Sequence, residues 1–264
     1  MDVAFEGYQG AKLSGRWHTS PTECRGIAVI THPYGFLGGS QDEPIVQLLV
    51  GHYLTQGMHV MTYNARGVQP SQGRVSWTMR SECEDMRLAV AYAMDRTTPD
   101  TRTPYVHVAG YSAGSMQAST VRPALTGPWS HAHVSYLLLS YPLGVRWALT
   151  CLQTSFFAHA LDDLVARISD RVSVHVIYCS RDQFTSAERY RAWESHLRTL
   201  SPQCVVDAVE TDHMWSSRRA RAVLVELLER QSPTNQVRSC LGRSRAAHFG
   251  TPAARQERRA CPPR

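Results

Sequence analysis

Short runs of apolar, β-branched and aromatic residues recur along the chain and predict β-strands. Several of these runs are apolar at nearly every position, which is typical of strands that are buried on both faces of a sheet. We expect strands at residues 13–17, 26–31, 58–63, 105–109, 134–140, 172–179 and 204–209.

Between these runs, apolar residues recur every three or four positions, which is the spacing of one helix face. Such stripes lie at residues 45–53, 83–90, 190–200 and 220–228. Because strands and helices alternate, we predict an α/β protein with a mostly parallel sheet and helices on both of its faces.

Two segments depart from this alternation. Residues 144–169 lie between two predicted strands and carry several large apolar side chains, so we expect a short lid insert made of two helices. From residue 231 onward the periodicity ends, and Pro, Ser, Arg and Gly dominate. We therefore predict one domain over residues 1–230 and a disordered tail over residues 231–264.

The charge is concentrated in that tail. Residues 231–264 hold seven arginines and one acid, which accounts for the whole net charge of +6. The remaining body is formally neutral and lacks the basic footprint of a nucleic-acid-binding domain, so we expect no nucleic-acid partner. An arginine-rich tail suits RNA or an acidic membrane, but this one has no amphipathic stripe and no interleaved aromatic residues, which favours a solvated end.

The composition, 43% hydrophobic and 19% charged, is that of an ordinary globular protein. No apolar run is long enough for a membrane span, and the acidic start of the chain does not resemble a secretory signal. The seven cysteines form no CxxC pair, and an odd number suits a reducing compartment. We expect a cytoplasmic protein without a metal or another cofactor, and the oligomeric state stays open.

The strongest chemical signal is the pentapeptide GYSAG at residues 110–114. It follows a predicted strand and opens a predicted helix, the context in which G-x-S-x-G forms a nucleophile elbow. Glycines on both sides of the serine allow the backbones of a sharp turn to approach closely. The helix N-terminus beside the serine favours negative charge. We predict that Ser112 is a nucleophile.

A serine nucleophile needs a general base, and the base needs an acid that orients it. In this kind of fold the chain order is serine, acid, histidine, and each group follows the carboxyl end of a strand. Asp182 follows the strand at 172–179, and His213 follows the strand at 204–209. We predict that these residues are the acid and the base, although an aspartate at this place is also a common turn former.

The other candidate acids and bases are less well placed. Two histidines lie inside predicted strands and are expected to be core residues, a third lies in the middle of a helix, and the remaining aspartates lie in the insert or adjoin the base itself. These residues are His107, His175, His196, Asp162, Asp163 and Asp212.

A glycine-rich loop at residues 31–40 follows the strand at 26–31. Acyl transfer requires two backbone N–H groups that bind the tetrahedral oxyanion. One would come from Ala113, which follows the nucleophile, and the other from this loop. Pro33 has no N–H, so Tyr34 is the expected donor. We expect His32 to bury its ring and to fix the loop.

In this set of motifs the chain resembles the α/β-hydrolase superfamily over about residues 3–230. Within it, the chain is similar to the dienelactone-hydrolase-like branch of small, mostly uncharacterised proteins. The matching segments are HPYGFLGGS at 32–40, NARGV at 64–68, DQF at 182–184 and DHMW at 212–215. The resemblance implies an eight-stranded, mostly parallel sheet and metal-free acyl chemistry, and it implies no particular substrate.

Two features depart from that branch. Many relatives have a phenylalanine after the nucleophile, where this chain has the smaller Ala113, and the arginine-rich segment from residue 231 lies outside the resemblance.

We therefore predict a serine hydrolase, of carboxylesterase or thioesterase type, that cleaves an ester or thioester through Ser112, Asp182 and His213. The position of the lid insert predicts that Trp147, Phe156 and Phe157 line an acyl pocket, and the alternative is that they only cover the edge of the sheet. The alternative function is a non-catalytic binding or scaffold protein with the same fold. An intact, ordered triad argues against that alternative.

Overall fold

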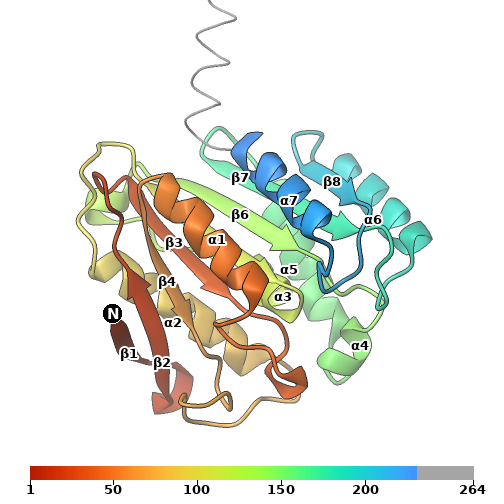
Figure 1. Cartoon of the computed structure of the whole chain (residues 1–264), viewed down its shortest axis with the longest axis horizontal. Coiled ribbons are helices and arrows are strands. Elements are labelled where there is room, and N and C mark those ends of the chain that lie inside the picture. Colours follow the sequence, from red (N-terminus) through yellow and green to blue (C-terminus); the bar gives the residue numbers. More distant parts are fainter. Residues whose placement is uncertain (231–264) are drawn as a thin grey trace, which may run out of the picture. The chain divides into compact units, whose positions relative to one another are not determined.

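Eight strands form one sheet in the computed structural model, which describes residues 1–230. They are β1 (Asp2–Glu6), β2 (Lys12–His18), β3 (Gly26–Thr31), β4 (Met58–Tyr63), β5 (Tyr105–Tyr111), β6 (His133–Leu139), β7 (Val172–Cys179) and β8 (Val205–Val209). Their order in the sheet is β1-β2-β4-β3-β5-β6-β7-β8 (Figure 1). The pairs β1–β2 and β2–β4 are antiparallel, and all other pairs are parallel. The prediction of a mostly parallel, eight-stranded sheet is confirmed.

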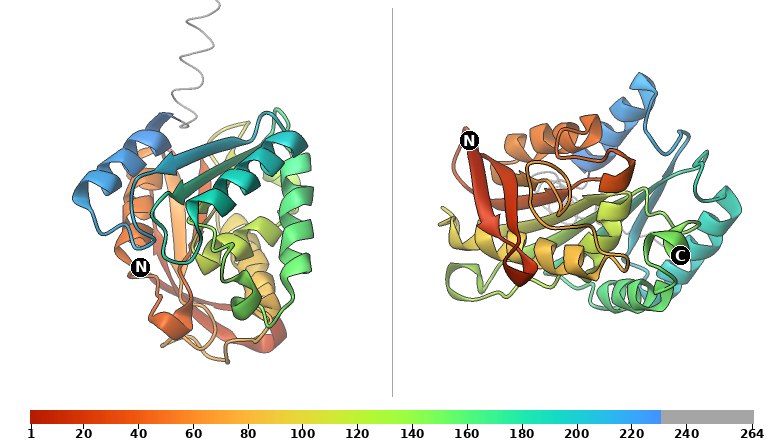
Figure 2. Two further views of the ribbon diagram at one scale, coloured as in Figure 1. Left: turned by 90° about the vertical axis from the view of Figure 1, so that its right-hand side faces the viewer. Right: turned by 90° about the horizontal axis from the view of Figure 1, so that it is seen from below.

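Helices cover both faces of this sheet. They are α1 (Pro44–Thr55), α2 (Arg80–Asp95), α3 (Ala113–Thr120), α4 (Arg146–Leu149), α5 (Thr154–Ala166), α6 (Ala187–Leu200) and α7 (Arg218–Arg230), with short 3₁₀ turns η1 (Tyr8–Gly10), η2 (Gly35–Leu37) and η3 (Gly127–Trp129). Helices α2, α3, α5 and α6 pack side by side in one layer, and α1 packs against β3 and β4 on the other face (Figures 1 and 2).

Burial explains why the central strands were visible in the sequence. All six residues of β3 are buried, and so are the last six of β7, as strands covered on both faces require. The edge strand β1 was missed because its residues are mostly exposed and form no apolar run. Only Phe5 is buried there; it pairs with Leu13 of β2, and its ring packs edge-on against that of Tyr63 at 5.6 Å.

The parallel strands β3 to β8 all end at the same edge of the sheet, because they run in one direction. The loops that follow them carry all the residues predicted to form the triad and the oxyanion hole. The predicted insert follows β6 and forms two helices, α4 and α5, as expected.

The compact unit that holds the sheet comprises residues 1–225, and residues 226–264 belong to a second unit. Of that second unit the structure describes residues 226–230, the end of α7. The predicted tail at 231–264 lies outside the described residues. Within residues 1–230, no helix has both the length and the apolar character that crossing a membrane requires.

Candidate active site

Ser112 lies at the turn between β5 and α3. Its backbone has φ 55° and ψ −121°, a conformation that residues with side chains adopt at an energetic cost. The turn is held from the neighbouring strand, because the Ser112 N–H donates to the carbonyl oxygen of Leu139 at 2.8 Å. The chain therefore takes the sharp strand-to-helix turn that the pentapeptide predicts.

The two glycines of the pentapeptide are required by close backbone approach. A Cβ atom on Gly110 would lie 2.2 Å from the carbonyl oxygen of Gly114, and a Cβ atom on Gly114 would lie 2.7 Å from the carbonyl oxygens of Thr31 and His32. Any side chain at either position would force the backbone apart. The turn thus depends on both glycines, and the second one also lets α3 pack against the end of β3.

The structure brings Ser112, Asp182 and His213 together in one hydrogen-bonded row. Nδ1 of His213 lies 2.6 Å from Oδ2 of Asp182, and Nε2 lies 2.8 Å from Oγ of Ser112. A carboxylate only accepts, so Nδ1 carries the proton and donates to it. Nε2 is then the acceptor of the Ser112 hydroxyl proton. Both the imidazole and the carboxylate are almost completely buried, which shields this row from water.

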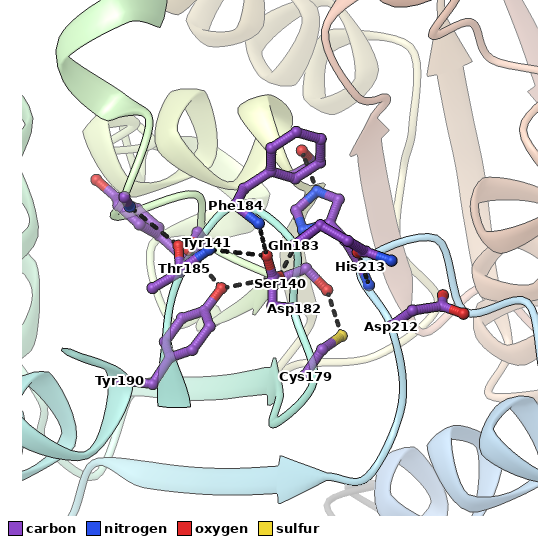
Figure 3. A network of polar contacts seen from close by, with 12 residues as sticks. Ser140, Tyr141, Cys179, Asp182, Gln183, Phe184, Thr185, Tyr190, Asp212 and His213 are labelled. Atoms are coloured by element: carbon purple, nitrogen blue, oxygen red, sulfur yellow. Dashed lines mark hydrogen bonds and ion pairs between the residues drawn. The ribbon is translucent and has the colours of Figure 1, made fainter. Parts of the chain in front are cut away.

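Further donors fix the orientation of the Asp182 carboxylate (Figure 3). Its Oδ1 accepts from the backbone N–H groups of Phe184 at 2.7 Å and Thr185 at 3.1 Å. The hydroxyl of Tyr190 donates to the carbonyl oxygen of Tyr141 at 2.8 Å and lies 3.2 Å from Oδ2, the oxygen that faces the imidazole. Burial raises the pKa of the Tyr190 hydroxyl, which therefore remains a donor. The carboxylate is held in one orientation, with one oxygen left for His213.

The loop that carries His213 is tied to the loop that carries Asp182 and to β5. The backbone N–H of His213 donates to Oε1 of Gln183 at 2.9 Å, and the carbonyl oxygen of His213 accepts from the hydroxyl of Tyr111 at 2.8 Å. The ring of Phe184 meets the imidazole edge-on, with 4.6 Å between ring centroids. These contacts leave the imidazole one position, between acid and serine.

Three buried side chains join the ends of β6 and β7 to the loop that carries His213. The indole N–H of Trp215 donates to Oγ of Ser140 at 3.0 Å, and this oxygen lies 3.2 Å from Sγ of Cys179. Burial raises the pKa of the Cys179 thiol to about 12, so the thiol stays protonated. Cys179 is completely buried at the end of β7.

These supporting residues were not identified from the sequence. Gln183 and Phe184 stand within the DQF segment and Tyr111 within the pentapeptide, so the motifs carried a signal for them. Trp215 stands within the DHMW segment and so carried a similar signal. Tyr190 carried none, because it lies in the apolar stripe of a helix.

The glycine-rich loop after β3 is fixed by His32, whose ring is buried as predicted. Nδ1 of His32 lies 2.5 Å from the carbonyl oxygen of Pro33, and Nε2 accepts from the backbone N–H of Ala65 at 2.9 Å. Burial lowers the pKa of His32 to about 4, so the ring is neutral at physiological pH. The ring thus connects the loop to the segment that follows β4.

The two expected oxyanion donors lie at the ends of neighbouring strands. Tyr34 directly precedes the turn η2 after β3, and Ala113 is the first residue of α3 after β5. Within residues 1–230, the backbone N–H of neither residue donates to a protein oxygen. Both groups are free to bind a ligand, and their role as an oxyanion hole stays a prediction.

The three residues predicted to line an acyl pocket differ in how far they are buried. Trp147 on α4 is exposed, and Phe156 is half-buried beneath the Arg80 guanidinium, which lies 4.3 Å from its ring centroid. Phe156 lines an open groove of about 610 Å³ together with Tyr8, and no triad residue lines that groove.

The prediction that Phe157 lines an acyl pocket does not fit the structure. Its side chain is completely buried in the hydrophobic core, so in this conformation it cannot touch a substrate. The sequence could not show which of Phe156 and Phe157 is buried, because both are phenylalanines at adjacent positions of one short apolar helix.

The other histidines take no part in the row. His107 is buried within β5, and burial lowers its pKa to about 3. His175 lies within β7, with Nε2 2.8 Å from a carboxylate oxygen of Asp207 on β8, and His196 on α6 lies 3.0 Å from Asp162 on α5. His107 and His175 are buried, as predicted from their places in strands, and His196 is exposed on its helix.

No protein-family model matches this chain, and a search of curated proteins finds no match. Solved structures do match it. A putative α/β hydrolase of unknown function from Agrobacterium tumefaciens is 20% identical, with a TM-score of 0.64, over 88% of this chain and 96% of that one. An α/β serine hydrolase without a lid from Xanthomonas campestris is 19% identical, with a TM-score of 0.64, over 88% and 95%.

An esterase from Pyrococcus furiosus is 16% identical, with a TM-score of 0.64, over 88% of this chain and 91% of that one. At such low identity the likeness concerns the arrangement of strands and helices. Together with the sheet order and the strand-to-helix turn at Ser112, it shows that this chain has the α/β-hydrolase fold.

Proposed function

We propose that this protein is a serine hydrolase that cleaves a carboxylic ester or thioester. The observation that carries the proposal is the row of hydrogen bonds from Asp182 through His213 to Ser112, at 2.6 and 2.8 Å. A buried histidine between a carboxylate and a serine hydroxyl on a strained turn is the arrangement that activates a serine. The names of the structural neighbours, a serine hydrolase and an esterase among them, support the same reaction class.

The reaction begins at the Ser112 hydroxyl. Its oxygen attacks the carbonyl carbon, and its proton passes to Nε2 of His213, which is already its acceptor. The Asp182 carboxylate stabilises the imidazolium and keeps the Nδ1 proton directed toward itself. The carbonyl oxygen becomes an oxyanion, which the N–H groups of Tyr34 and Ala113 bind.

The tetrahedral intermediate then collapses. Nε2 of His213 gives its proton to the leaving alcohol or thiol, and the acyl group remains on Ser112 as an ester. A water molecule attacks this acyl-enzyme while His213 accepts one of its protons. The carboxylic acid leaves, and Ser112 recovers its proton. Removal of one oxyanion donor typically lowers turnover by about 10²–10³-fold.

A substrate panel tests this proposal. We expect wild-type protein to hydrolyse some member of a series of p-nitrophenyl esters of increasing acyl length or of acyl-CoA thioesters, and Ser112→Ala to lose that activity while circular dichroism shows an unchanged fold. A folded wild-type protein that cleaves no ester or thioester would favour the non-catalytic binding protein instead.

A further inference from the structure

Six large hydrophobic side chains are exposed in the segments that follow the strands, including the short helix α4 and the turn η2. They are Phe36, Leu37, Trp77, Trp147, Leu152 and Met214, and their exposed fractions lie between 56% and 85%. We call this set the apolar rim. Among residues 1–230, the other large hydrophobic residues that are exposed are Met1 and Tyr8. Exposed apolar groups that gather in one region mark an interaction site.

The apolar rim lies at the edge of the sheet that carries the nucleophile. Its residues follow β3, β4, β6 and β8 and precede the next long helix, so they lie beyond the carboxyl ends of these strands. Figure 1 shows the arrowheads of β3 and β6 and the helix α4 on the same side of the molecule. Met214 adjoins His213, which contacts Ser112.

Side-chain contacts join two of these loops directly. The guanidinium of Arg80, three residues after Trp77, donates to Oε1 of Gln153 at 2.8 Å, and Gln153 follows Leu152. The start of α2 therefore lies beside the segment between α4 and α5, which places the chain near Trp77 next to the chain near Leu152.

Two exposed arginines flank the most exposed aromatic residue. Arg74 and Arg80 stand three residues to either side of Trp77, and within the described part of the chain Arg74 makes no ion pair.

The acidic side chains of the rim loops are already engaged or partly buried. Asp42 pairs with Arg16, Glu43 is half-buried, Glu82 is buried against Ser76, Glu210 lies near Arg181, and Asp212 accepts from the Ser216 N–H. Around Trp77 this leaves a positive charge that complements an anionic surface.

We propose that the apolar rim binds the surface of a phospholipid membrane that contains anionic headgroups. Tryptophan side chains prefer the boundary between headgroups and acyl chains, and guanidinium groups bind phosphate oxygens. A rigid protein seated across the rim would cover Ser112, whereas a lipid layer covers the rim and also supplies ester bonds to the serine. Only this last point rests on the proposed function; the binding itself does not.

The test is cosedimentation of the full chain carrying Ser112→Ala with vesicles of phosphatidylcholine and phosphatidylglycerol. We expect the protein to sediment with the vesicles and its tryptophan emission to shift to shorter wavelength. Trp77→Ser should weaken binding by about tenfold, since binding scales with the apolar area inserted. Tyr105→Ser, a half-exposed aromatic residue at the start of β5 and so at the opposite edge of the sheet, is the control and should leave binding unchanged.

The charge contribution has its own matched pair. Arg74→Glu should weaken binding by more than about fivefold, the effect of one basic residue near an anionic surface. Arg102→Glu, an exposed arginine before β5 at the opposite edge of the sheet, should have a much smaller effect. Binding that both rim variants leave unchanged would overturn the proposal and would assign any attraction to other parts of the chain.

Two further readouts keep the outcomes apart. A dimer in analytical ultracentrifugation that Trp77→Ser dissociates, without vesicle binding, would show that a second copy covers the rim and would overturn the proposal. Hydrolysis of a short, water-soluble ester by wild type tests the proposed function alone. Turnover of the soluble ester without vesicle binding would contradict the proposal that the apolar rim binds membranes. Vesicle binding without any turnover would contradict the proposal that the protein is a hydrolase.

Discussion

Two buried histidines stand at the same edge of the sheet, and they differ in their partners. His213 and His32 are both almost fully buried, and both ring nitrogens of each are hydrogen-bonded. The partners of His213 are a carboxylate and a hydroxyl, the side chains of Asp182 and Ser112. The partners of His32 are backbone groups, a carbonyl oxygen and an amide N–H.

The difference supports different roles for the two histidines. A hydroxyl can give up its proton when it attacks, and a carboxylate can stabilise the resulting imidazolium. A backbone amide and carbonyl can do neither, so they hold a ring in place. Burial alone therefore does not separate a general base from a structural histidine, whereas the chemistry of the two partners does.

The largest expected effect comes from removing the serine or the histidine of the row. We expect Ser112→Ala and His213→Ala each to lower kcat for the best ester by about 10⁶-fold. Because the two groups act as a unit, the double variant should be no slower than either single one. His32→Asn, the matched change at the structural histidine, should cost far less, and equal losses for the two histidines would refute the distinction.

The orienting acid should have the next largest effect. Asp182→Asn keeps an oxygen for the N–H groups of Phe184 and Thr185, but it no longer holds the Nδ1 proton of His213. We expect kcat to fall by about 10⁴-fold while the thermal midpoint changes little. A variant with near wild-type turnover would mean that His213 does not depend on this carboxylate.

Two adjacent phenylalanines in α5 extend the same reasoning to apolar side chains. Phe157→Ala should lower the free energy of unfolding by about 3–5 kcal/mol, because its ring is completely buried in the core. Phe156→Ala should cost less stability and should change the preference for acyl length if this ring meets the substrate. Urea unfolding and the ester series measure both effects, and an unchanged length preference would remove Phe156 from the site.

The smallest expected effect is the contribution of His32 to the pH dependence of stability. Burial lowers the pKa of His32 to about 4, below its value of about 6.5 in the unfolded chain. Between these values the unfolded state binds more protons, so the free energy of unfolding decreases as pH falls from 6.5 to 4. His32 contributes up to about 3 kcal/mol to this loss.

Urea unfolding at several pH values measures this loss of stability toward acid. His52 and His107, whose pKa values burial also lowers, contribute to the acid sensitivity of both proteins. The difference between wild type and His32→Asn therefore isolates the one ring. We expect the variant to lose less stability toward acid, and an identical pH dependence would contradict a neutral, buried His32.

Features set by nearby residues were accessible from the sequence. The predicted strands at 26–31, 58–63 and 172–179 match β3, β4 and β7, because buried strands are marked by continuous apolar runs. The turn at Ser112 was accessible for the same reason, since its two glycines adjoin the residue that they position.

Features that depend on the assembled sheet were not accessible. The hydroxyl of Tyr111 meets the carbonyl oxygen of His213 across 102 positions of sequence, and Tyr190 reaches Asp182 from a helix whose apolar stripe predicts only packing. The burial of Phe157 also depends on which face of α5 meets the core. No pattern of neighbouring residues in the sequence predicts these contacts.

Labelling with a fluorophosphonate probe, followed by peptide mass spectrometry, tests the central claim most directly, because the probe phosphonylates only an activated serine. We expect wild-type protein to be labelled at Ser112, His32→Asn to be labelled more slowly at the same residue, and His213→Ala and Ser112→Ala to remain unlabelled. A folded wild-type protein that stays unlabelled, or a His213→Ala variant that is labelled as fast as wild type, would contradict the account.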